Sequence, residues 1–338
     1  MSSAAALAPW LTAPLQQALH MQQHGAHALL LSSLPGLGAF ALGQAVAKAA
    51  LCEAAAAGEP ACGPCTACHL FDQRSHPDLY FLLPAALRVQ LGWQEPEAEG
   101  KAKPSQEIRI DEVRAFLNFA QATRARSRGK VVLVHPAEAM NTVAANALLK
   151  TLEEPSASLS FVLVTESPDL LLPTIRSRCQ ALSLPLPSLE QGTQWLKAQQ
   201  AELREDDAQM LLRAAGLRPQ QALDWLRGGL SAPVLAGFAR AVARADLSDF
   251  SAWRPAPVID LLQRLAHDLL RVCSGAAPQY FSLDQLPKAK QAKPLHEWLS
   301  LLQAAKAKAD HPLQLALWLE ALAAQGQAAL RAACKAGP

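Results

Sequence analysis

Short apolar runs organise the first 185 residues of the chain. Each run is bounded by turn residues and is apolar at nearly every position rather than at alternate positions. Such runs are typical of parallel strands that helices cover on both faces. The five runs lie at residues 28–32, 79–83, 131–134, 161–165 and 181–184.

Helical patterns fill the stretches between these runs. The segments 39–51, 110–120 and 144–155 are rich in Ala and Leu or have an amphipathic period. An alternation of strands and helices predicts an α/β domain built on a parallel sheet. The polar excursion at 84–106 is interpreted as a flexible surface loop.

The pattern changes after the last strand, where two prolines follow. Three short helices are predicted next, at 188–201, 206–215 and 219–226. From residue 230 onward the chain has only helical patterns. Prolines and glycines interrupt these patterns near 255–257, 275–278 and 294. We therefore expect three domains, at 1–185, 186–229 and 230–338.

Composition and charge give no indication of a nucleic-acid-binding or membrane protein. The 338 residues carry a formal net charge of +2, so the bulk charge does not predict a nucleic-acid-binding protein. No apolar run reaches the roughly 18 residues that a membrane span needs. The N-terminal segment MSSAAALAPW lacks the basic region of a signal peptide. These features predict a soluble, cytoplasmic protein without a membrane partner.

Four of the seven cysteines lie close together with metal-binding spacing. Three are spaced by three residues in a knuckle with a Gly-Pro turn, and the fourth ends the preceding helix. Four thiolates on one ion make a tetrahedral zinc site without an open position, so this zinc would be structural. The alternative is a set of unrelated core thiols, which the Gly-Pro turn disfavours. The predicted ligands are Cys52, Cys62, Cys65 and Cys68.

The glycine-rich loop before the helix at 39–51 stands where a phosphate-binding loop would lie. A working loop of the form G-x-x-x-x-G-K-[ST] needs a lysine for the β- and γ-phosphates and a hydroxyl for magnesium. Here Gly38 is followed by Ala39 and Phe40. Lys48 lies more than two helical turns further on, roughly 15 Å away, and cannot substitute.

The acidic pair that would hold magnesium is also missing. It should follow the strand at 131–134, where this chain has His135 and Pro136. Glu138, a little further on, is interpreted as a solvated surface residue. Because two independent parts of the site are absent, we expect no ATP in this chain's own site and no independent ATPase activity.

The segment 144–179 carries a specific resemblance. The sequence ANALLKTLEEP, a strand ending at Thr165 and the tripeptide Ser177-Arg178-Cys179 resemble the core of the clamp-loader AAA+ proteins of bacterial DNA polymerase III. In that family Thr165 would match the first sensor, and a four-cysteine zinc module follows the first helix. The resemblance implies that Arg178 is an arginine finger that reaches the ATP site of a neighbouring subunit. Arg176 is the less favoured candidate.

The resemblance also implies an assembly. A chain that lacks an ATP site but supplies a finger is similar to the delta-prime subunits of the loader. Its partners would then be gamma- or tau-like ATPases and a delta-like subunit, and it would meet the sliding clamp and primed DNA through the complex. It would act within the polymerase III holoenzyme, a DNA-directed DNA polymerase. The fold implied is an AAA+ sheet domain with a zinc module at 52–68, a helical lid and an all-α C-terminal collar domain.

Two other functions stay open. The chain could be an autonomous AAA+ ATPase with a divergent P-loop, like gamma or tau, or a zinc-dependent DNA-binding protein. The basic run 124–130 could contact phosphates but is interpreted as a solvated loop. Glu153 and Glu154 stand at the unfavourable C-terminal end of a helix dipole, which predicts that a group outside the helix uses or tolerates them.

Overall fold

The computed structural model of the chain describes residues 7–94, 104–126, 128–156, 158–306 and 315–335. The chain forms two compact units, Met1–Leu186 and Pro187–Pro338. The further division of the second unit after residue 229 stays a prediction.

The first unit is built on a five-stranded sheet, and the predicted parallel arrangement is confirmed. The strand order is β2-β3-β4-β1-β5, and each strand runs parallel to its neighbours. The strands are β1 Ala28–Ser32, β2 Leu79–Leu82, β3 Lys130–Val134, β4 Leu159–Thr165 and β5 Gln180–Ser183. Ser32 pairs with Thr165, so the loop after β1 and the end of β4 meet at the carboxyl edge of the sheet. This is the edge where ligands bind in open α/β sheets.

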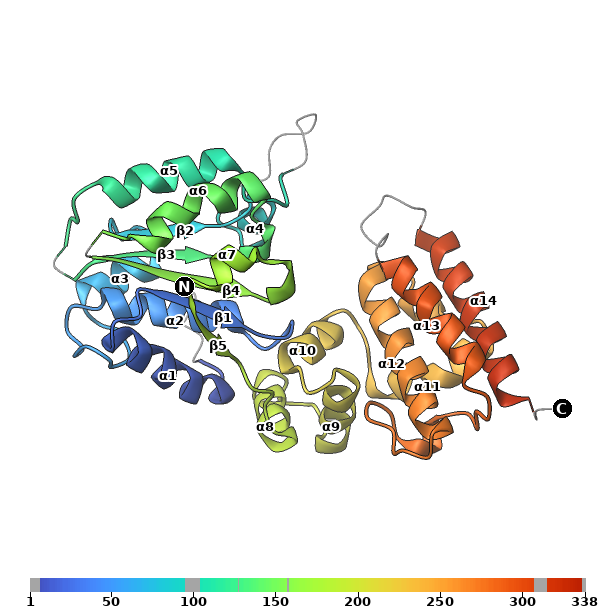
Figure 1. Cartoon of the computed structure of the whole chain (residues 1–338). Coiled ribbons are helices and arrows are strands. Elements are labelled where there is room, and N and C mark those ends of the chain that lie inside the picture. Colours follow the sequence, from blue (N-terminus) through green and yellow to red (C-terminus); the bar gives the residue numbers. More distant parts are fainter. Residues whose placement is uncertain (1–6, 95–103, 127, 157, 307–314, 336–338) are drawn as a thin grey trace. The chain divides into compact units, whose positions relative to one another are not determined.

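Helices cover both faces of this sheet (Figure 1). The helices α5 and α6 lie on one face, and α1, α2 and α3 lie on the other. The helices of the unit are α1 Thr12–Gln23, α2 Ala39–Leu51, α3 Thr66–Asp72, α4 Ala85–Gln90, α5 Ile110–Gln121, α6 Thr142–Glu153 and α7 Pro173–Arg176. Short 3-10 turns are η1 Pro9–Leu11, η2 Ala137–Ala139 and η3 Pro168–Leu170.

The helix α2 lies unusually close to the sheet. A side chain at Gly43 would bring its Cβ within 2.7 Å of Val164 on β4 and 2.9 Å of Leu133 on β3. Only glycine fits at such a close approach of helix to strand. Because α2 starts at the glycine loop and ends at Cys52, this contact positions both candidate sites against the sheet.

One loop prediction is wrong in part, and the helices α1, α3 and α7 were not predicted. The segment expected as a loop at 84–106 contains α4, because Ala-Ala-Leu after Pro84 favours a helical turn. Residues 95–103 of that segment lie outside the described residues. Neither α1 nor α3 has an apolar run long enough to stand out from its polar neighbours.

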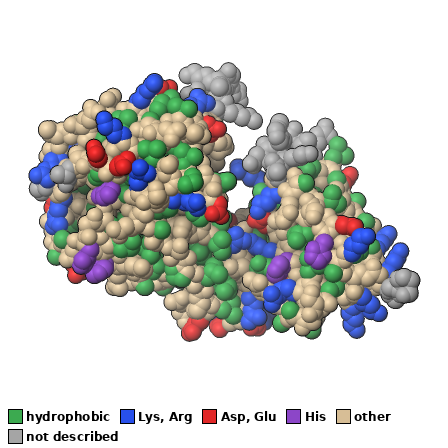
Figure 2. Space-filling model, in the orientation of Figure 1, with side chains coloured by type: hydrophobic (Ala, Val, Ile, Leu, Met, Phe, Trp, Pro, Cys, Tyr) green, Lys and Arg blue, Asp and Glu red, His purple; other side chains and the backbone are tan. Residues whose placement is uncertain are grey.

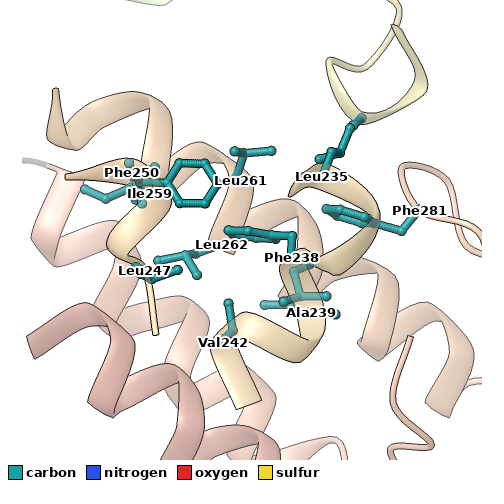
Figure 3. Packing of buried hydrophobic residues seen from close by; sticks show 14 of the residues in the cluster. Leu235, Phe238, Ala239, Val242, Leu247, Phe250, Ile259, Leu261, Leu262 and Phe281 are labelled. Atoms are coloured by element: carbon teal, nitrogen blue, oxygen red, sulfur yellow. The ribbon is translucent and has the colours of Figure 1, made fainter. Parts of the chain in front are cut away.

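The second unit is helical throughout its described residues, as predicted. One buried cluster runs from Leu196 to Ala333. At its centre, the rings of Phe238 and Phe250 meet edge to face at 5.4 Å, and Phe281 stacks on Phe238 at 6.2 Å (Figure 3). No helix in the described parts of the chain is long and apolar enough to cross a membrane.

The helices of the second unit are α8 Leu189–Gln199, α9 Glu205–Ala214, α10 Pro219–Arg227, α11 Ala232–Ala243, α12 Pro255–Cys273, α13 Lys293–Lys306 and α14 Leu315–Cys334. The bounds of α8, α9 and α10 agree with the predicted ranges to within two residues, whereas the predicted interruptions at 255–257 and 294 lie in the first turns of α12 and α13. Ser188 caps α8 with its side chain, and Gln191 completes the capping box. Two 3-10 turns, η4 Ser248–Phe250 and η5 Leu283–Gln285, complete the unit.

Candidate functional site

The glycine loop leads directly into the N-terminus of α2. Gly36 and Gly38 both have left-handed φ angles, of 83° and 87°, and Gly38 caps the N-terminus of α2. The N-terminal segment packs against this loop, because the Trp10 indole donates a hydrogen bond of 2.9 Å to the Leu37 carbonyl. This bond and the two glycines determine the conformation of the turn at the start of α2.

Two aromatic rings stand where a working site would hold magnesium. Phe40, at the hydroxyl position of the loop, stacks on His135, at the acidic position after β3, with ring centroids 4.4 Å apart and planes at 17°. Burial lowers the pKa of His135 to about 4, so this imidazole is neutral at pH 7. A neutral aromatic stack offers neither the hydroxyl nor the carboxylate that magnesium requires.

Glu138 and Thr165 at this edge, and Lys48 further along α2, have partners within the chain. Glu138 accepts a hydrogen bond of 3.0 Å from the Glu166 amide, and its second carboxylate oxygen is buried, so the prediction of a solvated residue is wrong. Thr165 accepts a bond of 3.1 Å from the Ser167 amide, which fixes the turn after β4. Lys48 forms an ion pair of 2.6 Å with Asp72 on α3. These contacts tie the side chains to neighbouring elements of the chain.

The four predicted cysteines come together at the other end of α2. Their sulfur atoms all lie within 4.8 Å of one another. Cys52 caps the C-terminus of α2, and Cys65 caps the N-terminus of α3. The sulfur of Cys52 lies 3.5 Å from that of Cys62 and 3.8 Å from that of Cys65. A tetrahedral ion with metal–sulfur bonds of about 2.3 Å requires sulfurs about 3.8 Å apart, so the group can hold a metal ion.

Backbone amides surround these sulfurs. The amides of Ala55 and Cys62 each donate to the Cys52 sulfur at 3.4 Å, and the Cys68 amide donates to the Cys65 sulfur at 3.5 Å. Burial opposes ionisation of Cys65, but hydrogen bonds from the Cys68 and Glu53 amides and from the Cys68 and Cys62 thiols together lower its pKa to about 6. Burial raises the pKa of Cys68. Amide donors of this kind stabilise thiolate, the form that binds metal.

Basic side chains of the run 124–130 contact the segment between Cys52 and Cys62. Arg126 makes a bidentate ion pair with Glu53, at 2.5 and 2.9 Å, and Arg128 donates to the carbonyl of Ala55. Lys130 is buried, lies over the Phe119 ring and donates to its carbonyl at 2.5 Å. The prediction of a solvated loop is therefore wrong for Arg126 and Lys130, which have partners inside the unit. It is correct for Arg124, which is exposed.

A buried carboxylate holds the same run in place. Asp78 accepts the amides of Ala125 and Arg126 at 2.8 Å each. On the face of the first unit shown in Figure 2, basic side chains are interspersed with acidic ones. Arg126 and Arg128 thus stabilise the segment that contains the cysteines, and this role was missed in the sequence analysis. This role could have been predicted only from the ion pair between Glu53 and Arg126. Sequence spacing does not show a pair of residues that are so far apart in the chain.

Arg178 follows α7, next to the C-terminus of α6. Its Nη2 lies 3.2 Å from the Glu153 carboxylate, and its Nη1 donates to the Thr174 carbonyl at 3.0 Å. Arg176 pairs with Asp169 at 3.4 Å on the surface. The prediction that a group outside α6 uses its terminal acids is confirmed for Glu153.

Comparisons with known proteins show the family of the chain. Residues 9–188 match the sequence profile of the family described as "DNA polymerase III, delta subunit". A protein named DNA polymerase III subunit delta' from Pseudomonas aeruginosa is 41% identical over 213 residues, which cover 62% of this chain and 60% of that protein. A protein of the same name from Yersinia pestis is 32% identical over 88% of this chain and 86% of that protein.

More distant similarities exist to other polymerase III subunits. A protein named DNA polymerase III subunit tau from Escherichia coli is 32% identical over 49% of this chain and 22% of that protein. The solved structure of a DNA polymerase III gamma subunit-related protein from Thermotoga maritima covers 94% of this chain with a TM-score of 0.47 and 17% identity.

Proposed function

The chain belongs to the DNA polymerase III delta-subunit family, and we propose that it is a delta-prime-type subunit of a clamp loader. A clamp loader is the assembly that uses ATP to place a sliding clamp on primed DNA. The observation that carries the proposal is the contrast within one unit between a nucleotide site without its chemical groups and an arginine held at a defined position.

The partners of the chain follow from this assignment. The ATPase neighbours would be gamma- or tau-like subunits, and a delta-like subunit would complete the ring. The sliding clamp and primed DNA would be met through the complex, within the cytoplasmic polymerase III holoenzyme. No membrane partner is part of the proposal.

The chain would not use ATP itself. The Phe40–His135 stack supports this, because it places two neutral rings where magnesium and its hydroxyl ligand would lie. Lys48 supports it too, because its ammonium group is paired with Asp72 away from the glycine loop. The chain is in this account a scaffold that donates one group to a neighbouring ATP site.

That group is the guanidinium of Arg178. A planar guanidinium can stabilise the charge that develops on a transferring phosphoryl group, and arginine fingers are worth about 10³–10⁵ in rate in other phosphoryl-transfer systems. Arg178 is partly exposed, as a residue that contacts a neighbour must be, while two of its nitrogens are anchored.

The cysteine knuckle would hold a structural zinc ion. Cys52, Cys62, Cys65 and Cys68 offer four sulfurs at separations that suit a tetrahedral ion, and four protein ligands leave no position for water. The ion would tie α2 to α3 and would supply no Lewis-acid chemistry. The segment 186–229 would act as a lid and 230–338 as a collar domain that joins the ring, because amphipathic helices bury their apolar stripes against partners.

Reconstitution tests this proposal. The loader is assembled from its ATPase, delta-like and clamp components with primed DNA, once with this chain and once without it. The expected result is that clamp loading and clamp-stimulated ATP turnover require the chain, and that it elutes with the ATPase subunits. Full loading in its absence would contradict the assignment. Tight, salt-dependent binding of duplex DNA by the chain alone would favour a DNA-binding protein instead.

A further inference from the structure

The guanidinium of Arg178 is held from two sides by different elements. Glu153, the last residue of α6, accepts from Nη2 at 3.2 Å, and the Thr174 carbonyl of α7 accepts from Nη1 at 3.0 Å. The side chain is 32% exposed, and its Nε is buried. Anchoring contacts on both terminal nitrogens restrict the side chain to one orientation.

The place of Glu153 is unfavourable for its own helix. A carboxylate at the C-terminus of a helix faces the negative end of the helix dipole. The C-cap residue Glu154 follows Glu153, and Pro155 prevents the helix from continuing. A carboxylate at this position lowers the stability of the helix. The ion pair with Arg178 offsets part of this loss.

A second ion pair nearby provides a contrast. Arg176 pairs with Asp169, whose side chain is 97% exposed, so that pair is fully solvated on one side. Solvated pairs of this kind contribute little to stability. The partly buried arginine with two anchors is therefore the better oriented of the two arginines beside α7.

We propose that Glu153 is a positioning residue that orients the Arg178 guanidinium for a phosphate bound by a neighbouring subunit. This inference rests on the proposed role of Arg178 as a finger. A guanidinium has five N–H donors. Nη1 of Arg178 donates to the Thr174 carbonyl at 3.0 Å and also to the Ser177 hydroxyl at 3.5 Å, whereas Nη2 donates once, to Glu153. The remaining N–H of Nη2 can donate to a phosphoryl oxygen while the guanidinium keeps the same orientation. Such preorganised charge is an advantage in catalysis, because no reorientation is needed during the reaction.

The test compares four variants in the reconstituted loader: Glu153→Ala, Glu153→Gln, Arg178→Ala and, as the matched control, Glu154→Ala. The Arg178-dependent turnover is defined as the part of ATP turnover that Arg178→Ala removes. Glu153→Ala should remove about half of it or more, because a finger that is free to move loses effective concentration at the phosphate. Glu153→Gln should retain more, since its amide oxygen still accepts a hydrogen bond, and Glu154→Ala should match wild type.

A double variant separates positioning from general damage. Glu153→Ala combined with Arg178→Ala should turn over ATP at the rate of Arg178→Ala alone, because a positioning residue has no role once its arginine is gone. A merely structural role of Glu153 would instead lower turnover further in the double variant. Side-chain NMR of ¹⁵N-labelled arginine in the full chain should report a more mobile Arg178 in Glu153→Ala than in Glu154→Ala.

The two levels of the account fail in different ways. Unchanged or increased turnover in Glu153→Ala, beside a loss in Arg178→Ala, would overturn the inference and leave the finger intact. Unchanged turnover in Arg178→Ala would overturn the finger and the inference together.

Discussion

The two ends of α2 carry opposite kinds of site. At its N-terminus lies the glycine loop, where Ala39 and Phe40 take the positions of the lysine and the hydroxyl of a nucleotide site. At its C-terminus Cys52 joins three further cysteines in a complete ligand set with suitable separations. The helix α2 therefore runs from a loop that lacks the lysine and the hydroxyl of a nucleotide site to a group of four cysteines that can hold a metal ion.

This contrast shows that a backbone and its chemistry are separable. The turn at Gly38 and the contact at Gly43 hold α2 against the sheet whether or not ATP binds. The rings of Phe40 and His135 pack against each other between the start of α2 and the end of β3. In the proposed function, the cysteine end of the helix needs its metal ligands for the fold, whereas the glycine end needs only to pack.

The largest effect is expected at the cysteine end. Cys65→Ser should lose most of the bound zinc and lower the melting temperature by roughly 10 °C, since the free energy of structural zinc binding is linked to folding. Metal content by mass spectrometry and calorimetric melting would show it. Cys273→Ser in the second unit is the control and should keep both properties. Full zinc occupancy in Cys65→Ser would remove the contrast between the two ends.

The glycine end should fail to bind nucleotide. Isothermal calorimetry of the isolated chain with magnesium ATP should give no saturable heat, because the loop lacks the lysine and hydroxyl that a phosphate-binding loop uses. The rival, an autonomous ATPase with a divergent loop, requires binding and turnover. Turnover that scales with protein concentration and disappears in Gly38→Pro would establish that rival.

The stack at the glycine end should make stability depend on pH. Burial holds the folded pKa of His135 at about 4, below the ordinary value of 6.5, so only the unfolded chain takes up this proton between those values. The stabilisation is present above pH 6.5 and is lost as the pH falls toward 4. The difference of about 2.5 units corresponds to about 3 kcal/mol of unfolding free energy.

Urea unfolding at pH 7 and pH 4.5 measures this effect. His135→Gln should lose less stability than wild type between the two pH values, because glutamine takes up no proton. The comparison between the two proteins cancels the contribution of other titrating groups. Equal pH dependence in both would mean that the imidazole is solvated and that the stack does not fill the site.

Much of this arrangement was predictable from local sequence. Apolar runs located the central strands β1, β3 and β4 because a parallel strand buried on both faces needs apolar residues throughout. The edge strands β2 and β5 were found from their runs too, although each has a single buried residue. The spacing of Cys62, Cys65 and Cys68 located the metal ligands because one knuckle determines their separation. The missing lysine was visible at Ala39, because the loop motif has a fixed length.

The remaining features depend on contacts between distant residues. Phe40 and His135 are far apart in sequence, and no local pattern indicates that their rings stack. Glu53 and Arg126 are likewise joined only by the fold, which is why the basic run was interpreted as solvated. For Glu153 the sequence showed an acid at an unfavourable helix end, but its partner Arg178 became evident only when α6 and α7 were placed side by side.

The most direct test of the central claim is the ATP turnover of the reconstituted loader with Arg178→Ala. The account predicts that the variant folds, keeps its zinc and assembles, but that clamp-stimulated turnover falls by about 2- to 10-fold, since only the one facing ATP site loses its arginine. Arg178→Lys should recover little, because an ammonium does not reproduce the planar fork of a guanidinium. Undiminished turnover and clamp loading by Arg178→Ala would contradict the claim that this chain serves a neighbouring ATP site.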